Sequence, residues 1–132
     1  MQLLAAVMKP MLRIDHIGIG SRDPQSAAAS LATILGAPPP TVDGADDDMF
    51  RVDLDDGAFL LFAAADPVHA EHVAFRVPEA RFAAVVERLR ARGIPFGNDP
   101  EAPTNGATSD PLGGGGRVYF ATEEGHLFEV TC

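Results

Sequence analysis

The chain carries one sequence pattern twice, and any fold that it adopts has to accommodate this repeat. Residues 56–62 read Asp-Gly-Ala-Phe-Leu-Leu-Phe and align without gaps on residues 124–130, which read Glu-Gly-His-Leu-Phe-Glu-Val. Earlier in each half, an acidic residue and a histidine open an apolar run, at 15–19 and again at 71–75. The sequence therefore predicts a tandem duplication. Each unit begins with an acid-His strand and ends with an acid-Gly-apolar strand.

Module one, over 11–66, shows the element order strand, helix and three strands. Strand character runs over 12–19, and Asp23 followed by proline is typical of a helix start. Gly36 ends this helix, and the Asp-Asp-Gly sequence at 55–57 separates two apolar runs in the manner of a β-hairpin. This order predicts a βαβββ unit.

Module two, over 67–132, repeats the order. Its helix opens at Pro78, carries apolar residues at helical spacing and ends at Gly93. A short strand is expected over 94–96, followed by a closing hairpin around 123–125. The predicted fold class is therefore α+β, built of two tandem βαβββ modules in which the second strand is the weakest.

The composition excludes some partners. The chain has 132 residues, a formal net charge of −9 and a pI near 4.7, so we expect one globular domain without a basic face for nucleic acid. Cys132 is the only cysteine, which rules out an intrachain disulfide and favours a reducing, cytoplasmic location. The apolar residues 1–10 are too few to span a membrane, and we expect them to form an N-terminal extension without a membrane role.

A long polar stretch over 97–116 interrupts module two. It contains three prolines and six glycines, and it is longer than the usual loop within a compact domain. Two interpretations remain open from the sequence: a mobile lid over a site, or a tolerated surface insertion.

The duplicated positions suggest a metal site. Three of the four equivalent strand positions hold metal-ligand residues, namely His16, His72 and Glu129, whereas the fourth holds Leu61. Strand alternation turns His126 to the face opposite Glu129. Two imidazoles and one carboxylate bind a divalent metal and leave coordination positions open. The sequence therefore predicts a divalent-metal centre.

Other polar residues are expected on the same faces. A three-residue loop in the closing hairpin places Tyr119 opposite Glu129, and alternation then places Arg117 on the same face. Arg76 shares its face with His72. These positions would bring one phenol and two guanidinium groups near the metal.

The residues that carry this pattern match a known family. The matching segments are Ile-Asp-His-Ile-Gly-Ile at 14–19, Glu-His-Val-Ala-Phe at 71–75, Gly-Arg-Val-Tyr-Phe at 116–120 and Glu-Gly-His-Leu-Phe-Glu at 124–129. Over residues 11–132 the chain resembles the vicinal oxygen chelate superfamily. This superfamily includes glyoxalase I, extradiol dioxygenases, methylmalonyl-CoA epimerase, fosfomycin-resistance thiol transferases and bleomycin-binding proteins. The resemblance implies paired modules that form a cupped mixed sheet with the helices outside, and a homodimer.

The resemblance also implies a function. It implies a metal-dependent enzyme acting on a small molecule with two vicinal oxygens, dioxygenase-like by its ligand set of His16, His72 and Glu129. Fe(II) or Mn(II) is the favoured metal, with Zn or Ni as alternatives. In this interpretation Tyr119 is catalytic, through hydrogen bonds to the bound oxygens.

One departure and two alternatives accompany this interpretation. Glyoxalase I and the epimerase use a fourth protein ligand where this chain has Leu61, which weakens both assignments. Arg76 and Arg117 are the candidate substrate-binding residues, and they would also serve a fosfomycin-type thiol transferase or another lyase or isomerase of the superfamily. The remaining alternative is a non-catalytic small-molecule binding module, in which the ligand positions would be expected to be lost.

Overall fold

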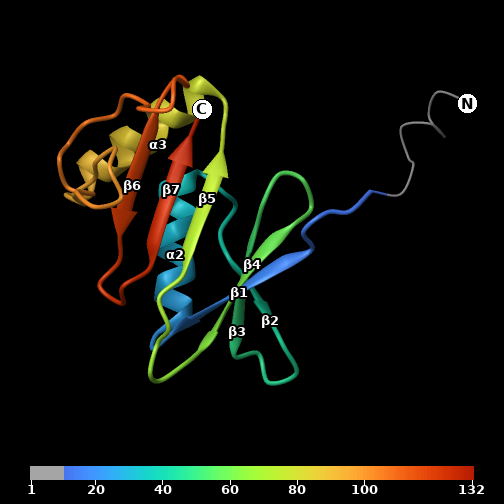
Figure 1. Ribbon diagram of the computed structural model, residues 1–132. Coiled ribbons are helices and arrows are strands. Elements are labelled where there is room, and N and C mark those ends of the chain that lie inside the picture. The colour runs from blue at the N-terminus through green and yellow to red at the C-terminus, as the bar shows by residue number, and fades with distance from the viewer. Residues whose placement is uncertain (1–10) are drawn as a thin grey trace, which may run out of the picture.

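The computed structural model describes residues 11–132, so the expected N-terminal extension over 1–10 lies outside the described residues. The elements in chain order are β1 (His16–Ser21), α2 (Pro24–Leu35), β2 (Thr41–Asp43), β3 (Met49–Asp53), β4 (Phe59–Ala64), β5 (His72–Arg76), α3 (Glu79–Ala91), β6 (Arg117–Ala121) and β7 (Leu127–Thr131). This order confirms the α+β fold class and its two tandem modules (Figure 1).

The strands form two mixed sheets, one in each module (Figure 1). The strand order is β1-β4-β3-β2 in module one and β5-β7-β6 in module two. In each module the first strand pairs in parallel with the last, which places His16 beside Phe59 and His72 beside Leu127. Because the register is the same in both modules, Leu61 and Glu129 occupy equivalent positions, as the aligned repeat predicts.

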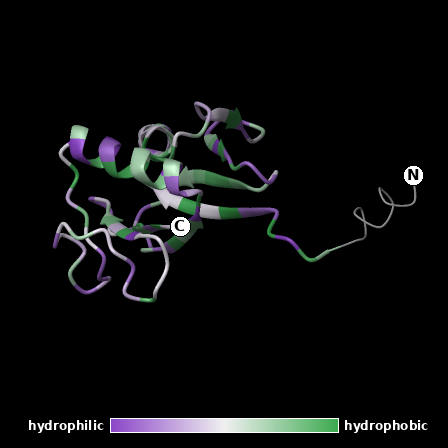
Figure 2. Cartoon of the chain, turned by 90° about the horizontal axis from the view of Figure 1, so that it is seen from above, coloured by the Kyte–Doolittle hydropathy of each residue, from purple (hydrophilic) through white to green (hydrophobic). Residues whose placement is uncertain are grey.

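Strand alternation gives each sheet one apolar face, and these faces share a single hydrophobic core with α2 and α3. Fully buried strand residues are Ile19, Val52, Leu60 and Phe62 in module one and Val118, Phe120, Phe128 and Val130 in module two. Figure 2 shows hydrophobic residues concentrated in the strands, with hydrophilic bands along the helices and in the loops. The candidate ligands His16, His72 and Glu129 have the opposite parity to these core residues. The candidate ligands therefore lie on the face of each sheet that does not contribute to the core.

The predicted boundaries of the first helix are confirmed. The Asp23 carboxylate accepts a hydrogen bond from the Ser26 backbone N–H at 3.2 Å, and proline occupies the first helical position. Gly36 adopts a left-handed conformation with φ 69°, which favours glycine, and it terminates the helix.

Two predicted strands differ from the structure. The first begins at His16 rather than at residue 12, because its neighbour β4 begins only at Phe59 and leaves nothing for the earlier residues to pair with. Residues 94–96 form no strand. The Ile94 amide instead bonds back to the carbonyl of Leu89 at the end of α3, and only Gly97 bridges to β6.

Helices from the two modules are joined at the C-terminus of α2. The Arg81 and Arg88 side chains of α3 donate to the carbonyls of Leu35 and Ile34 at 3.0 and 3.2 Å. These carbonyls belong to the last turn of α2, which lacks intrahelical donors and carries partial negative charge. The cations of α3 therefore stabilise the end of the neighbouring helix and fix how the modules pack.

Glu124 makes a second connection between the modules. Its carboxylate accepts from the Ser21 hydroxyl at 2.6 Å and from the Arg22 amide at 2.8 Å. Burial raises the pKa of Glu124, but these two hydrogen bonds outweigh it and hold the pKa below its ordinary value.

The neighbouring His126 is buried, with 2% of its surface exposed, and it also crosses the module boundary. Its Nδ1 accepts from the Glu71 amide at 3.0 Å, which leaves Nε2 to donate to the Gly20 carbonyl at 2.8 Å. The prediction that His126 faces away from the metal candidates is thus confirmed, and its role is to hold strand ends together.

Within residues 11–132, no helix has the length and apolar character needed to cross a bilayer.

The Glu124 contacts lead to a stability prediction. Replacing Glu124 with alanine removes two charge-assisted hydrogen bonds between the modules, and we expect the free energy of unfolding to fall by about 2 kcal/mol at neutral pH. Urea denaturation followed by circular dichroism measures this loss. The pKa of Glu124 is lower in the folded protein than its ordinary value of 4.5. Its contribution to stability is therefore complete above pH 4.5 and is lost as the pH falls through the lower folded-state pKa.

Glu123 provides the matched control, because it is exposed and adjacent. Glu123→Ala is expected to change stability by less than about 0.5 kcal/mol. Equal effects of the two substitutions at neutral pH would contradict the inter-module role of Glu124.

Candidate metal centre

Two of the predicted ligands meet on the sheet of module two. His72 lies on β5 and Glu129 on β7, and parallel pairing of these strands turns both side chains to the same face. The His72 Nε2 atom lies 2.8 Å from Glu129 Oε1. The imidazole is half exposed, whereas the carboxylate side chain is only 7% exposed. A buried carboxylate therefore sits next to a solvent-accessible imidazole.

The pair has the chemistry and the spacing of metal ligands. Imidazole and carboxylate bind divalent ions with bonds of about 2.1 Å, so two ligands at right angles lie about 3 Å apart. The observed separation of 2.8 Å is close to this value. His72 and Glu129 thus fit a divalent ion without a large movement of either strand.

His16 lies in a different environment. It is on β1 of the other sheet, where its ring stacks on Phe59 with 4.9 Å between centroids and its Nδ1 lies 2.7 Å from the Asp15 carboxylate. Among residues 11–132, no three or more His, Cys, Asp or Glu side chains are grouped closely enough to hold a metal ion. One chain therefore brings together His72 and Glu129, but not His16.

Leu61 is the module-one counterpart of Glu129. It lies opposite Gly18 on β1 and Arg51 on β3, as Glu129 lies opposite Ala74 on β5 and Tyr119 on β6. An aliphatic side chain at this position cannot coordinate. The sheet of module one therefore offers His16 as its one candidate ligand among the four duplicated positions.

Tyr119 lies where the hairpin register predicts. It is directly opposite Glu129, and its ring centroid is 6.1 Å from that of His72. The residue is 7% exposed, so its side chain is packed within the protein rather than free in solvent. This position would allow Tyr119 to contact a ligand held by His72 and Glu129.

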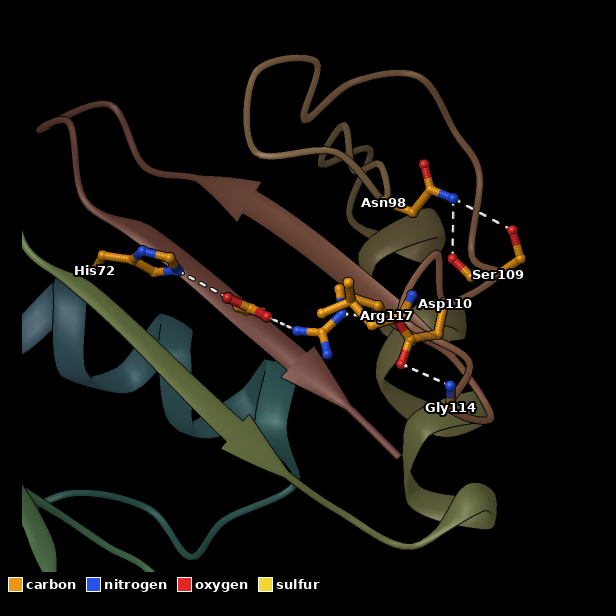
Figure 3. A network of polar contacts seen from close by, with 8 residues as sticks. His72, Asn98, Ser109, Asp110, Gly114 and Arg117 are labelled. Atoms are coloured by element: carbon orange, nitrogen blue, oxygen red, sulfur yellow. Dashed lines mark hydrogen bonds and ion pairs between the residues drawn. The ribbon is translucent and has the colours of Figure 1, made fainter.

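Arg117 reaches the predicted face but is engaged by carboxylates there. Its Nη1 donates to Glu129 Oε2 in a very close ion pair, and its Nε donates to Asp110 Oδ1 at 2.9 Å (Figure 3). The three side chains are 13% exposed or less. The second candidate, Arg76, is exposed on β5. The two arginines therefore differ sharply in how accessible they are to a substrate.

Asp110 is a site residue that the sequence did not single out. Hydrogen bonding to Arg117 is the main reason that its pKa lies below the ordinary value, and the backbone amides of Leu112 and Gly114 add to this effect. It belongs to the irregular segment 97–116, where no periodicity indicates which side chains turn inward. The one available signal was the need of a buried Arg117 for a counter-charge beyond Glu129.

A sizeable cavity lies away from these residues. Its volume is about 720 Å³, and it is bounded by α2 and the turn between β6 and β7, on the core side of the module-two sheet. Ser26, Ile94 and Phe128 are among its lining residues, whereas none of the three candidate ligands is. The donor chemistry of His72 and Glu129, rather than cavity size, therefore identifies the candidate site.

No protein-family model and no curated protein matches the chain. Solved structures do match. Oxidase ChaP-H1 is 29% identical, with a TM-score of 0.82 over 91% of this chain and 94% of that chain. Oxidase ChaP-H2 is 24% identical, also with a TM-score of 0.82, over 92% of this chain and 93% of that chain.

More distant structures share the fold as well. The fosfomycin resistance protein FosX from Listeria monocytogenes, in complex with Mn(II) and sulfate, is 19% identical with a TM-score of 0.67 over 93% of this chain and 91% of that chain. A glyoxalase/dioxygenase from Nostoc punctiforme is 20% identical with a TM-score of 0.68 over 95% of this chain and 97% of that chain. The common fold therefore spans almost the whole described chain.

Proposed function

We propose that this chain, which has the vicinal oxygen chelate fold, is a divalent-metal-dependent enzyme that acts on a small molecule with two vicinal oxygens. The observation that carries the proposal is the contact of 2.8 Å between His72 Nε2 and the buried Glu129 carboxylate. His16 supplies the third ligand from the equivalent position of module one.

A dioxygenase-like oxidation is the reaction that the ligand set supports best. Two histidines and one carboxylate leave open positions at Fe(II) for a substrate and dioxygen, and Leu61 adds no fourth ligand. Among the structures described above, the one with the highest identity is named an oxidase. We therefore favour Fe(II) or Mn(II), with Zn or Ni as alternatives.

The metal ion and the side chains around it would have separate roles in the reaction. A divalent ion bound there would act as a Lewis acid and lower the pKa of a hydroxyl group on a vicinal diol or catechol. Tyr119, packed opposite Glu129, is positioned to donate its phenol O–H to a substrate oxygen. The exposed Arg76 is available to attract an anionic substrate.

We further propose that the site is completed in a homodimer. Within residues 11–132, strands β1 and β5 each lie at the edge of a sheet, so each has a side that pairs with no described strand and that can meet a second copy. Leu12 and Ile14, in the segment that leads into β1, are 103% and 66% exposed, which is unfavourable for apolar side chains that face solvent. In the dimer, His72 and Glu129 of one subunit would meet His16 of the partner subunit.

A fosfomycin-type thiol transferase is the second candidate. The chain shares its fold with the fosfomycin resistance protein FosX, whose structure contains Mn(II) and sulfate. A phosphonate substrate requires accessible cations, however, and Arg117 is already bound by Asp110 and Glu129. This leaves Arg76 as the one predicted arginine that is exposed, so we rank the transferase below the oxidation. Another lyase or isomerase, or a non-catalytic binding module, ranks lower still.

The metal proposal predicts a loss of affinity on removing the buried ligand. Wild-type protein is expected to bind about one Fe(II) or Mn(II) per chain, and Glu129→Gln is expected to bind at least about 100-fold more weakly, because the amide cannot replace the carboxylate. Metal analysis by mass spectrometry and anaerobic titration calorimetry measure both quantities. Glu123→Gln, at an exposed position, is the control with unchanged affinity. A folded wild-type protein that takes up no divalent ion would overturn the enzyme assignment.

The reaction class has its own test. Fe(II)-loaded protein is expected to consume dioxygen when a catechol is added, and Tyr119→Phe is expected to lower kcat by about 10- to 100-fold with little change in metal content. An oxygen electrode measures the rate. Formation of a thiol adduct with fosfomycin, without oxygen uptake, would instead establish the transferase.

Sharing of the site between subunits predicts complementation. His16→Ala and His72→Ala proteins are each expected to be inactive, since each lacks a ligand at every site. Coexpressed chains that pair at random should recover about a quarter of the wild-type activity, because half of the dimers are mixed and each mixed dimer regains one complete site. No recovery in purified mixed dimers would show that each site belongs to a single chain.

A further inference from the structure

We infer that Asp110 is a positioning residue for the metal ligand Glu129 and that it acts through Arg117. The inference rests on the proposed metal site. It assigns the segment 97–116 a role in controlling that site, since this segment carries Asp110.

The first argument is the geometry of the carboxylate. The two oxygens of Glu129 have separate partners: Oε1 lies 2.8 Å from His72 Nε2, whereas Oε2 accepts from Arg117 Nη1. Figure 3 shows the continuous arrangement from His72 to Arg117 and Asp110. The guanidinium fixes the rotation of the carboxylate and leaves Oε1 directed toward the imidazole. Arg117 therefore selects which oxygen is presented to a metal ion.

The second argument is charge. Arg117 alone would neutralise Glu129, and a neutral pair attracts a divalent cation poorly. Asp110 adds a second carboxylate at 2.9 Å from Arg117 Nε, so the three side chains together keep one negative charge. Because all three are largely buried, solvent screens these interactions only weakly. Asp110 thus allows Arg117 to orient Glu129 without cancelling its charge.

The third argument is how firmly Asp110 is held. Its Oδ1 accepts from the Leu112 amide at 2.9 Å and its Oδ2 from the Gly114 amide at 3.1 Å. A side chain at position 114 would collide with the Asp110 carboxylate, so glycine is needed for this close approach. The carboxylate is therefore fixed by backbone donors on one side and directed at Arg117 on the other.

The segment is also tied to the rest of module two. Asn98 donates to the Ser109 carbonyl at 2.9 Å, and the Gly97 carbonyl accepts from the Tyr119 amide at 2.7 Å. These bonds connect the segment to itself and to β6, the strand that carries Arg117. Of the two interpretations open from the sequence, neither a lid nor a tolerated insertion accounts for Asp110. Through Asp110 and Arg117, the segment holds the proposed metal ligand Glu129 in position.

The test compares Mn(II) affinity in four purified proteins. Asp110→Asn keeps the size of the side chain and removes its charge, and we expect Mn(II) to bind about 10- to 100-fold more weakly, as for other residues that support metal ligands. Asp99→Asn is the matched control: it makes the same substitution in the same segment, where the exposed side chain accepts from the Glu101 amide and does not contact Arg117, and its affinity should equal that of wild type. Titration calorimetry gives the affinities, and thermal unfolding confirms that each metal-free protein is folded.

The fourth protein separates positioning from general support of the structure. This protein carries both Asp110→Asn and Arg117→Gln. It lacks the positive charge that neutralises Glu129, but the glutamine amide can still donate a hydrogen bond. The double variant is expected to bind Mn(II) at least about tenfold more tightly than Asp110→Asn alone, because contacting side chains act non-additively, and the two measured affinities give this recovery directly. A residue that only stabilised the fold would show no such recovery.

A measurement on wild type keeps the inference testable if Asp110→Asn does not fold. In the Zn(II)-loaded protein, the NMR signal of the Arg117 Nε–H is expected to be shifted downfield and protected from exchange, because it donates to Asp110. An exposed, rapidly exchanging Arg117 would overturn the inference, as would equal Mn(II) affinity of Asp110→Asn and wild type. Both results leave the metal enzyme intact, whereas a wild type that binds no Mn(II) would remove the proposed function together with this inference.

Discussion

Parallel pairing between the first and last strands of each module is the interaction on which the rest of the structure depends. It sets β5 beside β7 in a register that turns His72 and Glu129 to one face. The same register in module one sets β1 beside β4 and places Leu61 where module two has Glu129. A shift by one residue in either pair would exchange the core face for the polar face. The duplicated register therefore determines both the hydrophobic core and the candidate site.

The polar side chains on the two faces of the module-two sheet have different structural roles. On the core side, His126 and Glu124 bond to Gly20 and Ser21 and hold the modules together. On the other side, Glu129 is shared between an imidazole and a guanidinium. Because these polar groups act on opposite faces, changes in the candidate metal site need not disturb the contacts between modules. This separation is compatible with a common fold among proteins named oxidase, FosX and glyoxalase/dioxygenase.

Local signals in the sequence were sufficient for much of this arrangement. Capping residues located the first helix, and the length of the closing turn predicted that Tyr119 faces Glu129. The missing strand at 94–96 shows where such signals fail, since the backbone there returns to the end of α3 instead.

Contacts between distant segments could not be predicted in the same way. The pairing of Asp110 with Arg117 depends on the path of an irregular segment, which strand or helix periodicity does not encode. The separation of His16 from His72 depends on how two sheets pack, and an aligned repeat indicates equivalence but not distance. Arg117 was accordingly interpreted as a substrate-binding residue, although its partners in the structure are carboxylates. Both cases concern tertiary geometry rather than local structure.

The most direct measurement is a crystal structure of the Mn(II)-loaded protein with anomalous scattering data collected to locate the metal. The account predicts one strong peak per chain within about 2.0–2.3 Å of His72 Nε2 and a Glu129 oxygen, with His16 of the partner subunit as the third protein ligand. A metal peak remote from Glu129, or a fully loaded site from which His72 is absent, would contradict it.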